Sequence, residues 1–583
     1  MKSFLISFLL FSILISQKLD QSFLTITDTL SSKKPRYIHL TPHLLEIAKN
    51  GQNLSINKRI ELESIGFNFN SPLVSRGGMK RSESDGLDRI LDIDMFRFHY
   101  TITGYHSVNS EDLDNNDIPD YVESIAKEFK NIKYIIHDQM GYLKPPSDGY
   151  YSSSLDKGGS NHYDIYIRNL SSRYYGYVQP EEYAQGSGDN EQSGSLKELN
   201  AFTSYMAIRN NYFNFPLEQL ESIKVTLAHE YYHAIQFGYD GWEKPWLLES
   251  SAVWMEEEIY DEINDCYQYM KEWFDYPNRS LDESGYHWYG SFIFFEYLEQ
   301  HMGGNRILKE IMDESANLNS REKDGSHLAI DNALKKYGFS FQQAINGMSI
   351  ANIIMSSSFN ADKFSYEEAE SYPVEGPTIF SRVNFELGTI DTIISTGLAR
   401  FGSEYIEVTT RTPIQIDLIN TSGPISDLQM NSILKRNDDS YLIISSPAIN
   451  IDPLNFKSIR LSIVSQDSIK NNWDYKLIIK DGKLGTDSNV PRDFNLTNPY
   501  PNPFNGSIKF SVYMLKDARV SINIINHNGQ RVKAIHNGQL NSGNHYFNWH
   551  GKNESLEILS SGVYYIKVSS DSNQDWRKVT FIK

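Results

Sequence analysis

The strongest helical pattern in the chain lies at residues 215–238. Apolar side chains recur there every three or four positions, from Leu217 to Ile235, which places them along one face of an α-helix. Pro216 suits the first helical position, and Gly238 suits a C-cap. An amphipathic stretch that opens near residue 246 predicts a second helix soon after the first. We therefore expect two consecutive helices, the first of them buried.

Elsewhere the pattern divides the chain into parts of different character. Alternating stretches predict strands at 96–102, 163–167, 174–178 and 200–208, and helical spacing predicts helices at 121–140, 292–302, 306–315, 328–337 and 341–355. Short alternating strands fill 380–480, and strands separated by glycine-bearing turns fill the last part of the chain. The fold class expected is multidomain, with an α+β domain, an all-β sandwich and an Ig-like sandwich at 95–370, 380–482 and 495–583.

The N-terminal part is the least regular. Met1 and Lys2 precede an apolar run at 4–15, which is too short to cross a bilayer and predicts a secretory signal peptide at 1–16. Residues 17–94 are mixed and weakly periodic, and they fit either a pro-segment or an N-terminal arm. No later stretch predicts a transmembrane segment.

The composition of the chain indicates how many domains it can form and which binding partners are disfavoured. The chain has 583 residues, 40% of them hydrophobic and 13% aromatic, enough for roughly three or four folded domains. Its formal net charge of -19 disfavours nucleic acid or an anionic membrane surface as a partner. The single cysteine, Cys266, excludes an intramolecular disulfide framework.

Candidate chemistry lies on the first of the two helices. His229 and His233 stand four positions apart, so both imidazoles can reach one Zn²⁺, while Glu230 can act on a water bound there. One known arrangement takes a third histidine six positions further on, but Tyr239 stands there. Glu249 on the second helix is the alternative third ligand, which leaves a fourth position for water.

These two helices resemble those of the gluzincins, zinc peptidases with a glutamate ligand on the helix that follows the HExxH motif. The closer resemblance is to secreted bacterial metalloproteases that carry HE-aromatic-aromatic-HAIQFGY followed by WLLESSAVWMEE, and it runs over roughly residues 96–357. The resemblance implies a zincin-like fold, Zn²⁺ on His229, His233 and Glu249, Glu230 as general base, and a peptide or protein substrate. Glu256, Glu257 and Glu258 fit a solvated face, with one of them as a hydrogen-bond partner of a ligand histidine.

A peptidase of this kind also needs a donor for the developing oxyanion. Tyr289 is our first candidate, followed by His287 and Tyr286, in an aromatic stretch that leads into the helix predicted at 292–302. Aromatic side chains here equally fit core packing.

An acidic stretch at 112–123 resembles an EF-hand loop. Oxygen-bearing residues stand at loop positions one, three, five, nine and twelve, together with one backbone carbonyl, and predict a structural Ca²⁺ site. The residues are Asp112, Asp114, Asn116, Asp120, Glu123 and the carbonyl of Ile118. Asp117 occupies the position at which glycine is usual, because that turn needs a positive φ. The alternative is an acidic turn that caps the following helix.

The C-terminal motifs resemble the sorting domain of type IX secretion cargo. They comprise Tyr500-Pro501-Asn502-Pro503-Phe504-Asn505, then Asn528-Gly529, and Gly562-Val563-Tyr564 near the end. The resemblance implies export across the outer membrane by the type IX secretion machinery, with a secreted or cell-surface location. A binding module on the same sandwich is the alternative.

Together these features predict a secreted zinc metallopeptidase. The competing hypothesis is a non-catalytic adhesion protein that binds calcium and zinc on a zincin fold. Glu230 disfavours that alternative, since structural zinc would not require its carboxylate.

Overall fold

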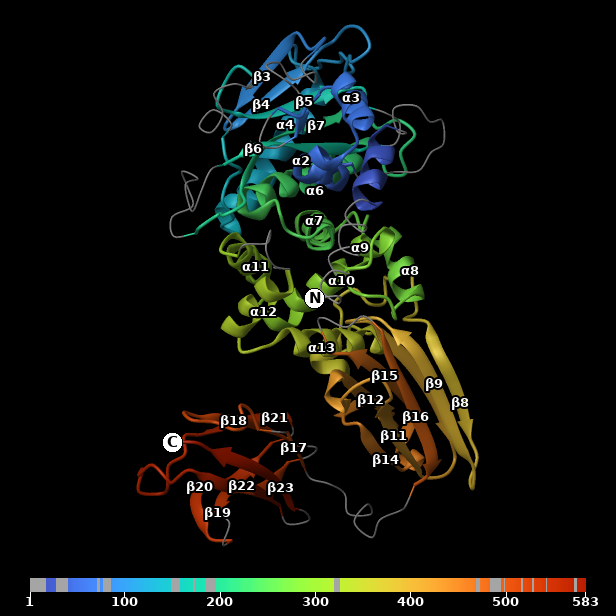
Figure 1. The fold of residues 1–583 in the computed structure, drawn as a ribbon, viewed down its shortest axis with the longest axis vertical. Helices are drawn as coiled ribbons and strands as arrows, with labels where there is room; N and C mark the ends of the chain where they lie inside the picture. The colour runs from blue at the N-terminus through green and yellow to red at the C-terminus, as the bar shows by residue number, and fades with distance from the viewer. Residues whose placement is uncertain are drawn as a thin grey trace. The chain divides into compact units, whose positions relative to one another are not determined.

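The computed structural model describes fifteen stretches of the chain. They are residues 17–27, 40–70, 74–76, 85–147, 158–170, 174–184, 196–318, 326–467, 472–482, 494–497, 499–514, 517–526, 529–541, 543–570 and 574–583. The chain forms two compact units, Met1–Asp481 and Gly482–Lys583 (Figure 1). The predicted signal peptide lies outside the described residues.

A five-stranded sheet forms the first layer of the larger unit. In spatial order its strands are β3 (Arg89–Ile93), β4 (Phe96–Tyr100), β5 (Tyr163–Arg168), β7 (Phe202–Arg209) and β6 (Gly176–Tyr183). The three central strands run parallel, and the two edge strands, β3 and β6, pair antiparallel to their neighbours. β3 lies before residue 95, so the sheet includes residues that the sequence analysis placed in the N-terminal part.

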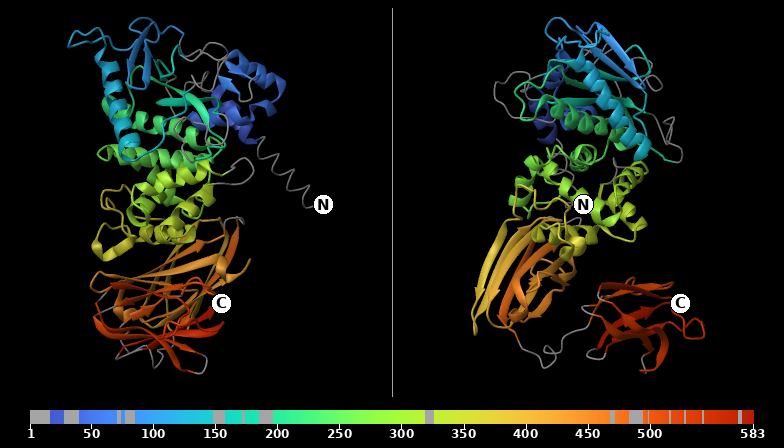
Figure 2. Two further views of the ribbon diagram at one scale, coloured as in Figure 1. Left: turned by 90° about the vertical axis from the view of Figure 1, so that its left-hand side faces the viewer. Right: turned by 180° about the vertical axis from the view of Figure 1, so that it is seen from behind.

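Both faces of this sheet are covered by helices. Ile165 and Ile167 face the main core with α4 (Asp120–Lys133) and α6 (Gln219–Asp240), because successive side chains of a strand point to opposite faces. Tyr166 between them belongs to a second core with the N-terminal helices α2 (Thr41–Asn50) and α3 (Ile56–Ser64), a short 3₁₀ turn (Gly51–Asn53) and the hairpin strands β1 (Phe67–Asn68) and β2 (Ser75–Arg76). Figure 2 shows α4 and the dark blue N-terminal helices on opposite sides of the sheet.

The helix that carries the HExxH motif begins and ends later in the chain than the sequence predicts. α6 begins after Glu218, whose backbone N–H donates to Glu221 Oε2 at 3.2 Å, so Pro216 lies before the helix. The predicted C-cap at Gly238 is wrong, since the helix continues to Asp240 and is capped by Gly241. A Cβ at Gly238 would lie 2.9 Å from Pro146 Cδ, so this glycine permits close packing rather than a turn.

A helical layer follows the sheet. It contains α7 (Pro245–Tyr260), α8 (Tyr267–Asp275), α9 (Tyr286–Gly290), α10 (Phe292–Met302), α11 (Arg306–Ala316), α12 (Ser326–Lys336) and α13 (Phe341–Ile354). The helices predicted at 292–302, 306–315, 328–337 and 341–355 are confirmed to within two residues at each end. A π-helical segment, Tyr134–Gln139, extends α4 toward the predicted end at 140.

Two sheets pack face to face after the helical layer. One has the order β13-β12-β15-β10-β8 and the other β14-β11-β16-β9. Their strands are β8 (Ile379–Phe385), β9 (Ile390–Leu398), β10 (Ser403–Thr410), β11 (Ile414–Asn420), β12 (Leu428–Arg436), β13 (Tyr441–Ser445), β14 (Ala448–Ile451), β15 (Phe456–Ser465) and β16 (Trp473–Asp481). The sandwich contacts α13 through Ser349 Oγ and Ser462 Oγ, 3.1 Å apart, and through Arg460, which donates to the Ile353 carbonyl.

The smaller unit is a separate β-sandwich around Trp549 and Phe581. Its sheets have the orders β17-β18-β21 and β20-β19-β22-β23. The strands are β17 (Phe494–Leu496), β18 (Ile508–Met514), β19 (Ala518–Asn526), β20 (Arg531–Leu540), β21 (Gly543–Trp549), β22 (Gly562–Ser569) and β23 (Gln574–Phe581). The chain is therefore multidomain, as expected. Among the described residues, no helix combines the length and the apolarity needed to cross a membrane.

Candidate metal centre

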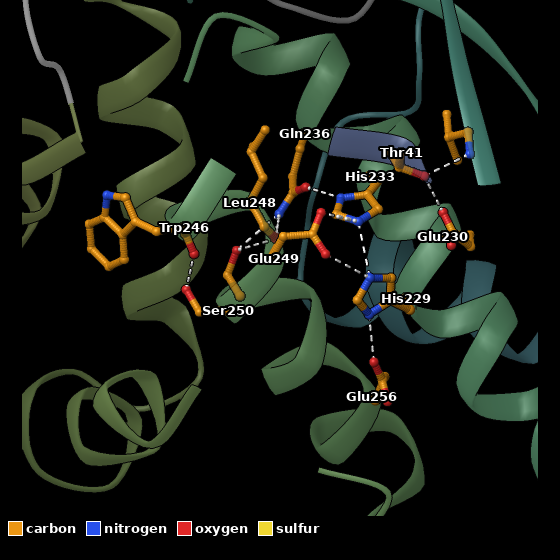
Figure 3. Close-up of polar contacts among 12 residues, drawn as sticks. Thr41, His229, Glu230, His233, Gln236, Trp246, Leu248, Glu249, Ser250 and Glu256 are labelled. Atoms are coloured by element: carbon orange, nitrogen blue, oxygen red, sulfur yellow. Dashed lines mark hydrogen bonds and ion pairs between the residues drawn. The ribbon is translucent and has the colours of Figure 1, made fainter. Parts of the chain in front are cut away.

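Two imidazoles and one carboxylate meet between α6 and α7. His229 Nε2 and His233 Nε2 lie 3.1 Å apart, and the Glu249 carboxylate reaches both, with its Oε2 3.4 Å from His229 Nε2 and its Oε1 3.3 Å from His233 Nε2 (Figure 3). All three side chains are buried. Two turns of neighbouring helices thus converge on one point, as the sequence predicts.

Gln236 fixes the orientation of His233. Its Nε2 donates to the Leu248 carbonyl and to Ser251 Oγ, each at 2.9 Å, so its Oε1 must face the other way. That oxygen lies 2.7 Å from His233 Nδ1 and can only accept, so Nδ1 carries the proton. The Nε2 of a neutral His233 therefore presents its lone pair to the common point.

Glu256 plays the same part for His229. Its Oε1 lies 2.5 Å from His229 Nδ1, and a carboxylate in this position keeps the proton on Nδ1. Glu256 is 5% exposed, so the solvated-face alternative is wrong for this residue. It is a hydrogen-bond partner of His229 instead.

The donor set fits a divalent metal ion. Four donors placed tetrahedrally at zinc–ligand distances of 2.0–2.1 Å would lie about 3.3 Å from one another. The three separations between the donor atoms are 3.1, 3.3 and 3.4 Å. When both rings are neutral and carry their proton on Nδ1, two lone pairs and a carboxylate face each other in a buried space, an arrangement that a cation relieves.

The charges of these groups are strongly coupled. Burial disfavours the charged form of Glu249, but His233 and His229 outweigh it and hold the pKa of this carboxyl well below its usual range. Burial likewise opposes protonation of His229, yet Glu249 and Glu256 together raise its pKa well above the usual value. In the metal-free protein this pair therefore retains charge, and a cation that binds here would replace the proton on His229 Nε2.

The carboxyl of Glu230 lies close to the two histidines of the same helix. Burial raises the pKa of Glu230, while the nearby His229 and His233 and a hydrogen bond from Thr41 oppose the rise. The Thr41 hydroxyl donates to Glu230 Oε2 at 2.8 Å (Figure 3). A carboxyl with a raised pKa is a better proton acceptor and donor near neutral pH than an exposed glutamate.

The edge strand β6 comes unusually close to Glu230. A Cβ at Gly176 would lie 3.3 Å from Glu230 Cγ and 3.1 Å from both Thr226 Cγ2 and the Ala207 carbonyl. Glycine at the start of β6 therefore lets the strand run against the α6 face that carries Glu230.

Of the three oxyanion candidates, the structure places Tyr289 near Glu249 and Glu230, whereas Tyr286 is 42% exposed. Burial raises the pKa of the Tyr289 hydroxyl well above its usual value, and Glu249 and Glu230 add to the rise. The hydroxyl therefore stays protonated and can donate. His287 points elsewhere: its ring packs on Trp273, and burial and the nearby Arg279 lower its pKa to about 4.

The acidic loop at 112–123 is exposed and closed by its own hydrogen bonds. Asp112 accepts from the N–H groups of Asn116 and Asp117, and Asn116 Nδ2 donates to both Asp114 and Glu123. Asp117 has φ 68°, the left-handed conformation that the loop position requires. The residues remain a predicted Ca²⁺ site, with Asp120 bonded to the Leu113 N–H.

A second acidic group lies at the far end of α7. Donor atoms of Glu257, Asp261 and Glu368 also lie within 4.8 Å of one another. Cys266 Sγ donates to Glu257 Oε2 at 3.1 Å, and burial and this carboxylate raise the pKa of the thiol well above its usual value. No residue of this group was singled out as a metal ligand from the sequence.

Comparison with known proteins assigns the smaller unit. Residues 500–574 match the family described as the FlgD Ig-like domain. The C-terminal domain is Ig-like. No curated protein matches the chain.

Similarity to solved structures is slight. PorZ, a surface component of the type IX secretion system of Porphyromonas gingivalis, is 20% identical with a TM-score of 0.12, over 18% of this chain and 14% of PorZ. Latent PorU from the same organism is 15% identical with a TM-score of 0.19, over 30% of this chain and 18% of PorU. A β-1,2-glucanase from Parabacteroides distasonis is 13% identical with a TM-score of 0.11, over 30% of this chain and 28% of the enzyme. Similarities this low carry no argument about activity.

Three residues near the site were not expected from the sequence. Thr41 and His43 lie in the weakly periodic N-terminal part, and no local pattern points to them. His43 is held by Ser22 Oγ at 3.1 Å from its Nδ1, and burial lowers its pKa to about 4 although Glu249 opposes the shift. Gln236 lies within the motif helix, three positions after His233, and that spacing alone could have suggested it.

Proposed function

We propose that the protein is a secreted zinc metallopeptidase. The observation that carries the proposal is the convergence of His229, His233 and Glu249 at tetrahedral spacing, with Glu230 on the same helix beside them. Structural zinc sites take all four ligands from the protein, whereas this group offers three. A zincin-like fold for the sheet and helical layer is part of the same proposal.

Each residue has a role that its surroundings allow. A bound Zn²⁺ would acidify a water molecule and polarise the scissile carbonyl. Glu230 accepts the proton that the attacking water loses and returns it to the amine nitrogen of the leaving group. Its raised pKa suits both transfers.

Tyr289 is proposed as the donor to the oxyanion. Its hydroxyl is protonated in this environment and lies near Glu249 and Glu230. Donation to the carbonyl oxygen as negative charge develops would stabilise the transition state more than the ground state. His287 contacts Trp273 instead and has no role in the proposal.

Export by the type IX secretion machinery and a secreted or cell-surface location belong to the proposal as well. They are supported by the C-terminal Ig-like domain and by the motifs that begin at Tyr500. Calcium binding at the acidic loop is proposed as a structural feature that fixes the start of α4.

The test compares Glu230→Gln with Glu283→Gln, a matched change at an exposed carboxylate. We expect Glu230→Gln to retain zinc and to lose about 10²–10⁴-fold in kcat/KM on a quenched peptide library, since general base catalysis contributes that much. Glu283→Gln should match the wild type. Full activity in Glu230→Gln would refute the role of Glu230 as the general base. If the wild type and both variants each bind one zinc ion per chain but hydrolyse no peptide, the adhesion hypothesis is favoured.

A further inference from the structure

Thr41 is hydrogen-bonded to Glu230, the proposed general base. Its hydroxyl accepts from the Val178 N–H at 3.0 Å and donates to Glu230 Oε2 at 2.8 Å. Both roles are fixed, because an N–H can only donate and its acceptor must then give its own proton to the carboxylate. A water activated by Glu230 must donate to the same carboxylate, so the Thr41 hydroxyl competes with that water for this acceptor.

The same threonine also covers the free edge of the sheet. β6 is an edge strand that pairs only with β7 among the described strands, and Val178 directs its N–H away from that partner toward Thr41. An extended peptide adds to a sheet through such outward-facing backbone groups. Thr41 thus occupies both the edge and the catalytic carboxylate.

The N-terminal part is anchored firmly on the sheet. Leu44 and Ile47 of α2 belong to the core that covers Tyr166 and Tyr205, while Leu45 belongs to the main core of the α6 and α7 layer. The chain after α2 returns to the same place, since Val74 N–H donates to the Ala48 carbonyl. Thr41 is therefore held in place by packing on both sides.

The catalytic group is closed in this state. Glu230 is 2% exposed, and the three metal-binding side chains are each exposed by 3% or less. Hydrolysis of a polypeptide requires access to these groups, so some covering part must move first. α2 is the covering element that touches Glu230 directly.

We propose that residues 40–70 are an inhibitory segment, which occupies the peptide-binding edge of β6 and competes for Glu230 through Thr41 until it leaves. The inference rests on the proposed peptidase function. It assigns to the N-terminal part the role of a pro-segment rather than an arm, and it names the contact through which inhibition acts.

The experiment uses the full chain with a specific protease site inserted between residues 78 and 79. The chain is compared intact and after cutting, with the N-terminal fragment removed by chromatography below the unfolding transition. We expect kcat/KM on the quenched peptide library to rise at least about tenfold after removal, at unchanged zinc content, because a bond to a charged group is worth roughly this factor.

A point variant tests the contact without a cut. Thr41→Val keeps the shape of the side chain and removes the hydroxyl. Thr27→Val makes the same change at a threonine whose hydroxyl donates to the Phe23 and Leu24 carbonyls. In the intact chain, Thr41→Val should raise activity several-fold and speed hydrogen exchange at the Val178 amide. Thr27→Val should change neither.

The outcomes separate the two proposals. Equal activity of intact and cut chains at equal zinc content would overturn the inhibition and leave the peptidase function standing, and so would unchanged activity in Thr41→Val. Unchanged exchange at Val178 in Thr41→Val would overturn the contact itself. If the cut chain unfolds, the intact Thr41→Val chain decides. If every zinc-loaded chain is inactive while exchange at Val178 depends on Thr41, the peptidase function fails, and the inhibition fails with it.

Discussion

The hydrogen bond between His233 Nδ1 and Gln236 Oε1 provides a direct test of how the proposed metal site is held. Gln236→Met keeps the length of the side chain and removes all of its polar atoms. Ser251 keeps its bond to the Leu247 carbonyl, so the main loss is the acceptor for the buried N–H of His233. The neutral imidazole can then carry its proton on Nε2, the atom that must bind the metal.

Two effects of this change can be separated by size. Loss of an acceptor for a buried N–H costs about 1–3 kcal/mol of unfolding free energy in the metal-free protein. Loss of a partner that orients a metal-binding histidine lowers metal affinity by about 10–100-fold, which corresponds to about 1.4–2.7 kcal/mol. Both effects act in the same direction on the zinc-loaded protein.

The assay is competition for zinc against a fluorescent chelator, with urea unfolding of the metal-free protein alongside. The control is Gln268→Met, at an exposed glutamine bonded to Asp265. We expect a Kd for zinc raised about 10–100-fold in Gln236→Met and unchanged in the control. A folded Gln236→Met protein with a Kd within about twofold of the wild type would refute the orienting role.

Two further predictions concern stability. Gly176→Ala should lower the unfolding free energy by about 1–3 kcal/mol in urea titrations, because the new methyl group would press on Glu230 and the Ala207 carbonyl. The control is Gly562→Ala, since a Cβ at Gly562 meets open space. Equal losses of unfolding free energy in the two variants would contradict the packing argument. Burial lowers the pKa of His137 from 6.5 to about 4, so the unfolded chain binds a proton more readily than the native protein does. The native protein therefore keeps its full stability above pH 6.5 and loses part of it as the pH falls toward 4. The unfolding free energy of the wild type relative to His137→Phe should therefore fall by about 3 kcal/mol between these limits, and a constant difference would refute the shift.

The parts predicted best from the sequence are those with a local cause. The spacing of His229 and His233 and the apolar period of α6 are set within one helix, so the pattern alone places both imidazoles on one side. The helices after Phe292 follow for the same reason. Glu249 came from a second local pattern combined with a family resemblance.

The features that the sequence did not predict depend on contacts between residues far apart in the chain. Gly238 has the composition of a helix end, but Pro146 from another part of the chain packs against it. Thr41 and Glu230 are 189 positions apart, and no local pattern connects them. The N-terminal helices are weakly periodic because they rest on a sheet face that later residues supply, including Tyr166 and Tyr205.

Cys266 offers a view of motions within the helical layer. It is the only cysteine in the sequence, it is 1% exposed, and it is bonded to Glu257. A thiol reagent can therefore modify the native protein only when the region around α8 opens. The rate of that modification reports the free energy of local opening next to α7, from a single reactive atom and without any introduced label.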